Sequence, residues 1–190
     1  MSEIQSNKFS PASGTALQIG DSGDTITIPS GATIVNSGTA TGFGEANTPS
    51  FGVYITGGDQ NIPNATVTTI TFNTEDWDTN SAFDTSNYRF IVPSGQAGKY
   101  YFSSRIYMEY GNNANEIGRL GIYKNGTPVA IFGGLANGTE NQGKSLSVNT
   151  ILDLAVSDYV EMKIYHNQGG TQAIDDDPDF TYFTGFKVTS

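Results

Sequence analysis

The stretch YVEMKIY, residues 159–165, is the clearest guide to the fold of this chain. In it, Val160, Met162 and Ile164 alternate with a glutamate and a lysine. Successive side chains of a β-strand point to opposite faces, so this alternation predicts a strand with one buried face and one wet face. A fold of antiparallel strands around a shared core is therefore expected.

Similar runs recur along the chain between turn residues, and apolar residues at helical spacing over long windows are absent. The further expected strands lie at residues 51–57, 65–72, 88–93, 99–110, 119–124, 128–133, 145–154 and 180–188. The Asn-Gly pair in KNG, residues 124–126, predicts an antiparallel hairpin on a type I′ turn. About nine or ten strands joined by such turns predict an all-β sandwich or barrel.

The composition excludes several function classes. The chain of 190 residues has a formal charge of −10, and no basic residue lies between Lys8 and Arg89. Such a surface repels phosphate groups, so neither nucleic acid nor an anionic membrane is expected as a partner. With no cysteine, disulfides and thiolate catalysis are excluded. The sequence contains neither a secretory signal nor a run of about 20 apolar residues, so we expect synthesis in the cytoplasm without membrane insertion.

Residues 1–45 differ in kind from the rest of the chain. They contain no aromatic residue between Phe9 and Phe43, and their apolar residues come in short pairs such as Ile26 with Ile28. Ordering the backbone costs about 1–2 kcal/mol per residue, whereas a buried Leu or Ile side chain returns about 1.5–3 kcal/mol. A single copy should not fold alone. The segment is either one that needs other chains or a neighbouring surface, or a flexible tether.

The larger part of the chain, residues 65–188, resembles the complement C1q-like and tumour-necrosis-factor-like jelly roll. The matching pieces stand in order: VTTITFN at 67–73, FDTSNYRFIVPSGQAGKYYFS at 83–103, LGIYKNG at 120–126, LDLAVSDYVEMKI at 152–164 and YFTGFKV at 182–188. Ser157 and Asp158 stand where the family has Gly-Asp, and no collagen-like repeat precedes the domain. The resemblance implies a jelly-roll sandwich of about ten strands over residues 46–190, which assembles as a homotrimer and binds ligands through loops at its outer end.

The segment SPASGTALQIGDSGDTITIPSGATIVNSGTATGFG, residues 10–44, resembles the β-structured repeats of fibre proteins from marine tailed phages. That resemblance implies a short, trimeric, β-structured stalk over residues 1–45, in which three chains wind together with their small apolar side chains facing inward. It also implies that this segment attaches the chain to other virion proteins.

Two acidic stretches, TEDWDTNSAFD at 74–84 and IDDDPDF at 174–180, are expected to form loops at the tip of the head. The candidate binding residues in them are Asp76, Trp77, Asp78, Asp175, Asp176, Asp177 and Asp179. Calcium prefers several carboxylate oxygens in a flexible loop, so the candidate calcium ligands are Asp175, Asp176, Asp177 and Asp179, and no other cofactor is expected. The alternative is that both stretches are solvated acidic loops. Trp77 either stacks on a sugar ring or pins its loop to the core, and pinning is favoured.

Two further features bear on catalysis and assembly. His166 is the only histidine, and the sequence has no Gly-x-Ser-x-Gly elbow, so a structural residue at a strand end is favoured over a catalytic base or a zinc ligand. In KYYFSSRIYMEY, residues 99–110, tyrosines occupy both faces of one strand. Such a strand is buried either against a neighbouring subunit or under loops.

These features predict a non-enzymatic virion structural protein of a tailed phage, made in the host cytoplasm and located on the virion. We expect a short homotrimeric fibre or spike that attaches to a host surface glycan or protein, or to another virion component, with avidity from three linked contacts. The alternatives are a glycan-binding depolymerase-type tail spike with paired carboxylates, a capsid decoration or head-fibre protein, and a secreted binding module.

Overall fold

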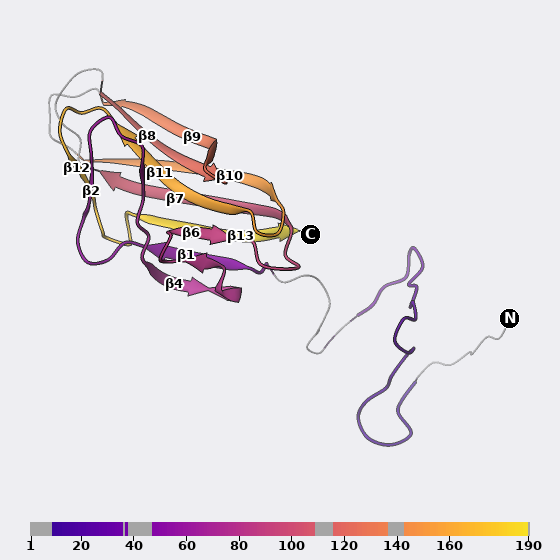
Figure 1. Ribbon diagram of the computed structural model, residues 1–190. Helices are drawn as coiled ribbons and strands as arrows, with labels where there is room; N and C mark the ends of the chain where they lie inside the picture. The colour runs from indigo at the N-terminus through magenta and orange to yellow at the C-terminus, as the bar shows by residue number, and fades with distance from the viewer. Residues whose placement is uncertain (1–8, 36, 38–46, 109–115, 137–142, 190) are drawn as a thin grey trace. The chain divides into compact units, whose positions relative to one another are not determined.

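The computed structural model describes residues 9–35, 37, 47–108, 116–136 and 143–189 (Figure 1). The chain divides into two compact units, Met1–Phe43 and Gly44–Ser190. All strands of the described residues belong to the second unit, and the two units are described separately below.

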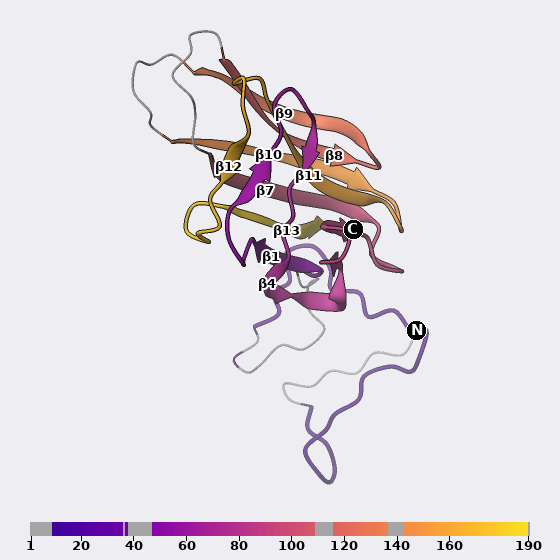
Figure 2. The ribbon, with the colours of Figure 1, turned by 60° about the vertical axis from the view of Figure 1, so that its left-hand side comes forward.

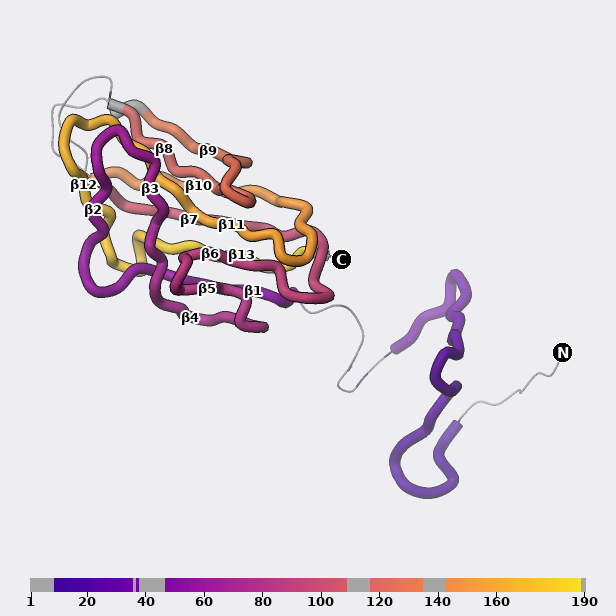
Figure 3. Tube along the Cα trace, in the orientation of Figure 1, coloured from indigo at the N-terminus to yellow at the C-terminus, as the bar shows by residue number. Residues whose placement is uncertain are grey.

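The strands of the second unit are β1 (Ser50–Tyr54), β2 (Gln60–Ile62), β3 (Thr68–Thr69), β4 (Thr74–Asp78), β5 (Phe83–Asp84), β6 (Arg89–Ile91), β7 (Gly98–Met108), β8 (Glu116–Lys124), β9 (Thr127–Ala136), β10 (Lys144–Leu154), β11 (Tyr159–His166), β12 (Gln172–Ile174) and β13 (Tyr182–Thr189). One short 3₁₀ segment, η1 (Thr79–Ser81), follows β4. Figure 3 traces the path of the chain through all of them.

The strands form two antiparallel sheets that pack face to face (Figures 1 and 2). Sheet A has the order β2-β12-β7-β13-β1-β4, and β10 pairs with β7 as well. Sheet B has the order β5-β6-β11-β8-β9, and β3 pairs with β11. Neighbours in each sheet are mostly far apart in sequence, as β1 and β13 are, so the predicted all-β jelly-roll sandwich is confirmed.

An aromatic core joins the two sheets. The Phe51 ring of sheet A lies 5.2 Å from the Phe90 ring of sheet B and 4.9 Å from Phe183, and all three side chains are fully buried. Gly185 lies directly beside this cluster, and a Cβ atom there would lie 2.7 Å from the Phe102 ring and 2.8 Å from that of Phe51. Only a glycine leaves room for the rings, which accounts physically for the glycine within YFTGFKV.

On β11 the predicted buried face of 159–165 is confirmed, but the opposite face is not wholly wet, because Glu161 is only 8% exposed. Val160, Met162 and Ile164 are fully buried, while Lys163 on the opposite face is only half-buried. The expected strand at 65–72 is wrong in its extent, because only Thr68–Thr69 pairs as β3. Beyond β3, Ile70 N still donates to Met162 O at 2.9 Å, and the Gln60 side chain binds the adjacent backbone, where its amide donates to Thr69 O at 2.9 Å and accepts from Thr71 N at 2.9 Å.

The predicted Asn-Gly hairpin joins β8 to β9, with φ of 49° at Asn125 and 78° at Gly126. Asp158 anchors this turn to the start of β11. Its carboxylate lies 2.8 Å from Lys124 Nζ and accepts a hydrogen bond of 2.7 Å from Asn125 Nδ2. These partners, Lys124 first, lower the pKa of Asp158 to about 2. Ser157 adopts a φ of 70°, the left-handed conformation that explains the glycine found here in the resembled family.

The first unit exposes its apolar side chains. Their exposed fractions are 48% for Leu17, 65% for Ile19, 58% for Ile26, 47% for Ile28, 57% for Ile34 and 82% for Val35. The residues GDSGD, 20–24, form a surface turn, in which Asp24 N donates to Asp21 O at 3.0 Å. No strand occurs in residues 9–35 of one copy, so the β-structured stalk stays a prediction about an assembly of several chains.

Candidate functional site

The outward face of sheet A carries a row of aromatic side chains. On β7, Tyr100 and Phe102 point into the core. Because successive side chains of a strand point to opposite faces, Tyr101 and Tyr107 point outward. On β13 the same alternation buries Phe183 and turns Phe186 outward. The predicted placement of tyrosines on both faces of 99–110 is therefore confirmed for the residues of β7.

The outward rings contact one another across the strands. Tyr101 lies 5.4 Å from Phe186, and Tyr107 lies 5.8 Å from Phe180, over whose ring the Arg105 guanidinium lies at 5.5 Å. Phe180 remains 43% exposed in the single chain. These rings and the arginine are at least partly exposed, and side chains of these types are favoured in protein interfaces. We refer to this row as the aromatic face of sheet A.

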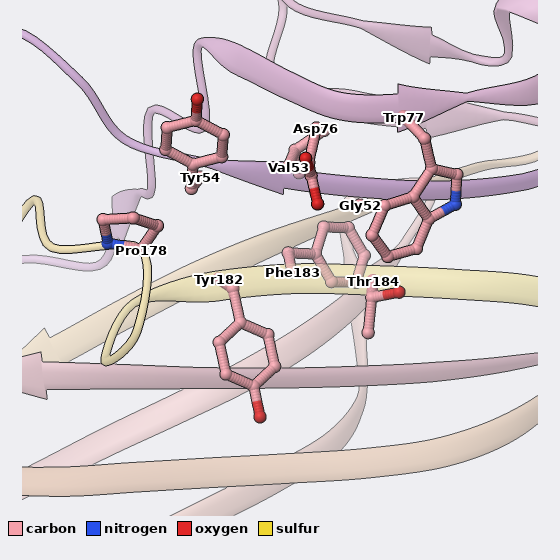
Figure 4. Close-up of a pocket in the computed structure, with 9 residues that line it drawn as sticks. All are labelled: Gly52, Val53, Tyr54, Asp76, Trp77, Pro178, Tyr182, Phe183 and Thr184. Carbon is pink, nitrogen blue, oxygen red and sulfur yellow. The ribbon is translucent and has the colours of Figure 1, made fainter.

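A hollow of about 430 Å³ lies on this same face (Figure 4). Its lining residues are Gly52, Val53, Tyr54, Asp76, Trp77, Pro178, Tyr182, Phe183 and Thr184. Trp77 covers Gly52, where a Cβ atom would lie 2.4 Å from the indole ring. The indole therefore rests on bare backbone, and the rest of the ring stays available for contact.

A β-bulge directs two consecutive side chains toward the hollow. Gly52 pairs with Trp77, but the next residue, Val53, pairs with Glu75, so Asp76 has no partner on β1. An unpaired residue of this kind re-aims the side chains around it. Figure 4 shows Asp76 and Trp77 reaching from β4 over β1 toward β13. The hollow therefore combines ring surfaces with one carboxylate.

Three of the candidate binding residues lie elsewhere than predicted. Asp76, Trp77 and Asp78 belong to the edge strand β4 and not to a loop, because residues 74–78 pair with β1. Trp77 is 46% exposed, so the favoured pinning to the core is wrong. Asp78 is structural, since its carboxylate accepts hydrogen bonds from Ala82 N at 3.0 Å and Phe83 N at 2.9 Å.

The second acidic stretch does form a loop, which connects β12 to β13. Two of its carboxylates hold the turns of the loop. Asp175 accepts a hydrogen bond from Asp177 N at 2.7 Å, and Asp177 accepts one from Asp179 N at 2.9 Å. Pro178 of this loop lines the same hollow as Asp76, so the two acidic stretches meet in the fold.

The carboxylates that converge are Asp175, Asp176 and Asp59, whose oxygens all lie within 4.8 Å of one another. Asp176 is also fixed by a 2.9 Å hydrogen bond from Gly58 N. Asp177 and Asp179 are not in this group, and the sequence analysis missed Asp59 because it is a lone acid far away in the sequence. The chemistry of three carboxylates suits a hard cation, and calcium binding here stays a prediction.

His166 is a structural residue, as predicted. Its side chain is fully buried, Nε2 lies 2.9 Å from the Ile62 carbonyl oxygen, and Nδ1 accepts a hydrogen bond from Gln168 N at 3.3 Å. Both ring nitrogens are thus engaged with backbone groups, so the imidazole ties β11 to β2. A general base must have a nitrogen that can reach a substrate, which this one does not.

Two antiparallel sheets with a jelly-roll strand order, an aromatic core and ring-rich outward face define a sandwich of the C1q and tumour necrosis factor class. Residues 53–188 match the model of the C1q domain, and the chain belongs to that family. Within the described ranges, no helix has the length and apolar character to cross a membrane.

A curated relative is the uncharacterized protein YqcC of Bacillus subtilis (strain 168), which is 32% identical over 138 residues. The match covers 70% of this chain but only 35% of YqcC, so the chain spans about a third of the length of that relative.

Three solved structures show the same fold. They are the globular domain of zebrafish complement 1qA protein (20% identity, TM-score 0.50, 75% of this chain and 98% of that one), murine APRIL at pH 5.0 (12%, 0.52, 73% and 98%) and the Eiger TNF of S. frugiperda (13%, 0.53, 74% and 92%). Because these sequence identities are low, the similarity shows only that the fold is shared.

Proposed function

We propose that this chain forms a homotrimer through the aromatic face of sheet A and serves as a non-enzymatic attachment protein. The observation that carries the proposal is the outward row of rings, among them Tyr101, Tyr107 and Phe186, which one copy leaves partly uncovered. Buried rings supply most of the energy of many protein interfaces. C1q and tumour-necrosis-factor-like domains commonly form homotrimers, in line with this use of the face.

The first unit supports assembly by a separate argument. Its six Leu, Ile and Val side chains in the described range are 47% to 82% exposed, an arrangement that a lone chain does not stabilise. Three copies wound together would bury these side chains against one another. We propose that residues 1–45 act as the stalk of the homotrimer and dock it on its carrier.

The carrier that we propose is a phage virion, on which the chain is a short fibre or spike that attaches to a host surface glycan or protein. The resemblance of residues 10–44 to phage fibre repeats supports this location, and the engagement of His166 by backbone groups supports a non-enzymatic role. Antibody labelling of purified particles by electron microscopy tests the location. Labelled tail or capsid positions separate a tail fibre from a capsid decoration or head-fibre protein.

The mass in solution tests the assembly. We expect a trimer mass by size exclusion with light scattering, both for the full chain and for a shortened chain that begins at Gly44. The variant Tyr101→Asp should shift the mass toward the monomer, because it places a charge among the rings. The matched control Ile91→Ser changes an outward side chain of sheet B and should leave the mass unchanged. A monomer mass for the full parent chain would overturn the proposal.

The depolymerase alternative has one observation in its favour, which is the carboxylate of Asp76 inside a hollow lined with rings. A glycosidase needs a second carboxyl about 5–10 Å from the first. Release of reducing ends from host polysaccharide, abolished in Asp76→Asn, would favour the enzyme over the attachment protein.

A further inference from the structure

The outward face of sheet B carries cations beside tyrosine rings, whereas on sheet A Arg105 lies over the phenylalanine ring of Phe180. On β11, the alternation that buries Met162 and Ile164 turns Lys163 and Tyr165 outward. On β8 the same rule buries Leu120 and Ile122 and turns Arg119 outward. The pairing Tyr165↔Arg119 places side chains of these two strands directly beside each other.

The cations on this face lie over tyrosine rings. Arg119 lies 5.9 Å from the Tyr165 ring centre, and Lys163 lies 5.3 Å from that of Tyr123. A ring attracts a cation through its quadrupole but does not cancel the charge. Lys163 also pairs with Glu161 at 3.1 Å, whereas Arg119 is exposed and has no ion pair within the described part of the chain. The Arg119 fork is thus oriented while its N–H donors stay available.

Arg119 borders a hollow of about 310 Å³, at the lower end of the range for ligand sites. Its lining residues are Val67, Arg119, Gly121, Tyr123, Ile131, Lys163, Ile164 and Tyr165. Gly121 is required here, because a Cβ atom would lie 2.8 Å from the Tyr123 ring. The hollow therefore has an apolar floor, two tyrosine walls and two cations at its edge.

The net charge of the chain limits the kinds of ligand that this hollow could bind. With a formal charge of −10, the protein repels anions in general, so an unneutralised arginine beside a hollow marks a place for one small anionic group. A guanidinium pairs with a carboxylate through two parallel hydrogen bonds. The apolar floor and the tyrosine walls suit the flat, hydrophobic face of a sugar ring.

We propose that this hollow binds a carboxylate-bearing sugar unit of an acidic polysaccharide, with Arg119 as the anchor of the carboxylate. The hollow is complete within one copy, since β8, β9, β11 and Val67, which precedes β3, form it. It lies on the sheet opposite to the aromatic face, so a homotrimer formed through sheet A leaves it open. This proposal adds a ligand class to the proposed attachment role. It rests on that role for its biological purpose, whereas the binding itself does not depend on it.

Titration calorimetry of the full chain with tetragalacturonate tests the proposal. The control ligand is the fully methyl-esterified tetrasaccharide, which keeps the rings and removes the charges. We expect binding of the acid form only, weakened at least about tenfold in Arg119→Gln, because the variant removes the charged, hydrogen-bonded pair with the carboxylate. The variant Arg119→Lys should retain part of the affinity, since it keeps the charge but loses the planar fork.

The control variant Lys99→Gln removes an exposed cation that pairs with Asp153 and should bind as the parent does. An unchanged thermal midpoint shows that Arg119→Gln folds, and its mass in solution reports separately on the homotrimer. No binding of the acid form, equal binding of the ester, parent-like affinity in Arg119→Gln, or stronger binding of polyphosphate would each overturn the inference. If the chain is a trimer but does not bind the acid form, this inference is wrong and the proposed assembly still holds. If the chain is a monomer that binds the acid form, the proposed assembly is wrong and this inference holds.

Discussion

The outward faces of both sheets carry tyrosines, but these tyrosines contact different kinds of side chain. On sheet A the tyrosines Tyr101 and Tyr107 contact phenylalanine rings, and on sheet B Tyr123 and Tyr165 lie under cations. On sheet A the rings contact one another and Arg105 lies over Phe180, and such a row of rings is complementary to another row of its kind. On sheet B cations lie over the tyrosines, an arrangement that is complementary to an anion. From this difference we expect that the partner of a tyrosine across the strands decides what a face binds. The following variants test this difference between the faces, in decreasing order of the effect that we expect.

The largest loss of stability is expected from Gly185→Ala, which disturbs the aromatic core between the two sheets. The new Cβ atom would overlap the rings of Phe102 and Phe51, and overpacking of this kind costs about 2–3 kcal/mol. Urea denaturation measures the loss in the free energy of unfolding. Gly170→Ala is the control, because no atom lies within 4 Å of its added Cβ, and a loss equal to that of Gly185→Ala would contradict the steric explanation.

The variant Asp158→Asn should destabilise the sheet B side by about 2 kcal/mol at neutral pH, since it removes the ion pair with Lys124 at the β8–β9 turn. The pKa of Asp158 in the folded chain is lowered to about 2 from 3.8, so its stabilisation is present above pH 4 and is lost as the pH falls through about 2. Thermal unfolding of parent and variant should therefore converge at the acidic end.

A matched comparison for that prediction is Asp153→Asn, which removes the exposed pair with Lys99. The two side chains are 75% and 54% exposed, and pairs of this kind contribute little to stability. A loss in Asp153→Asn as large as that in Asp158→Asn, or a constant gap between parent and Asp158→Asn down to pH 2, would contradict the account.

The variant Trp77→Ala addresses the aromatic face alone. It removes a 46% exposed ring beside the hollow, so the stability of one copy should change little while the trimer becomes easier to dissociate, by about tenfold in concentration. Sedimentation equilibrium measures the dissociation. Trp77→Phe should recover part of the affinity, and binding of tetragalacturonate should be unaffected. Dissociation identical to that of the parent would remove Trp77 from the contact.

The smallest effect concerns the loop carboxylates, which belong to neither face. If Asp59, Asp175 and Asp176 hold calcium, millimolar calcium should raise the thermal midpoint by an amount that corresponds to about 1 kcal/mol. Asp59→Asn should abolish the rise. Asp177→Asn should keep it, because that carboxylate lies outside the group and the amide oxygen still accepts the bond from Asp179 N. An equal calcium response in Asp59→Asn and the parent would exclude the site.

Much of the head could be predicted from local sequence. The alternation in YVEMKIY identified the buried face of β11, and the Asn-Gly pair identified the β8–β9 turn. Both follow from the geometry of a few consecutive residues, which the sequence states directly. The short strands β2, β4, β5 and β12 were missed, because their two to five residues carry no alternation that stands out from a loop.

The candidate site was predicted only in part, and the errors share one cause. TEDWD reads as an acidic loop, yet pairing with β1 makes it an edge strand and a bulge turns Asp76 and Trp77 toward one hollow. The proximity of Asp59 to Asp175 could not be predicted, because no local pattern in either segment indicates that the two segments lie side by side. The acidic composition correctly drew attention to these stretches, but it could not say which carboxylates hold turns and which converge.

Local sequence thus specified the strand alternation, the key turn and the acidic character of the surface, since each depends on neighbouring residues or on composition. The packing of segments that are distant in sequence places Trp77 on Gly52, Arg119 over Tyr165 and Asp59 beside Asp175 and Asp176. The physical reason is that a strand specifies which side chains share a face through its period of two. Which strands lie side by side, and in which register, is specified by the packing of the whole sandwich.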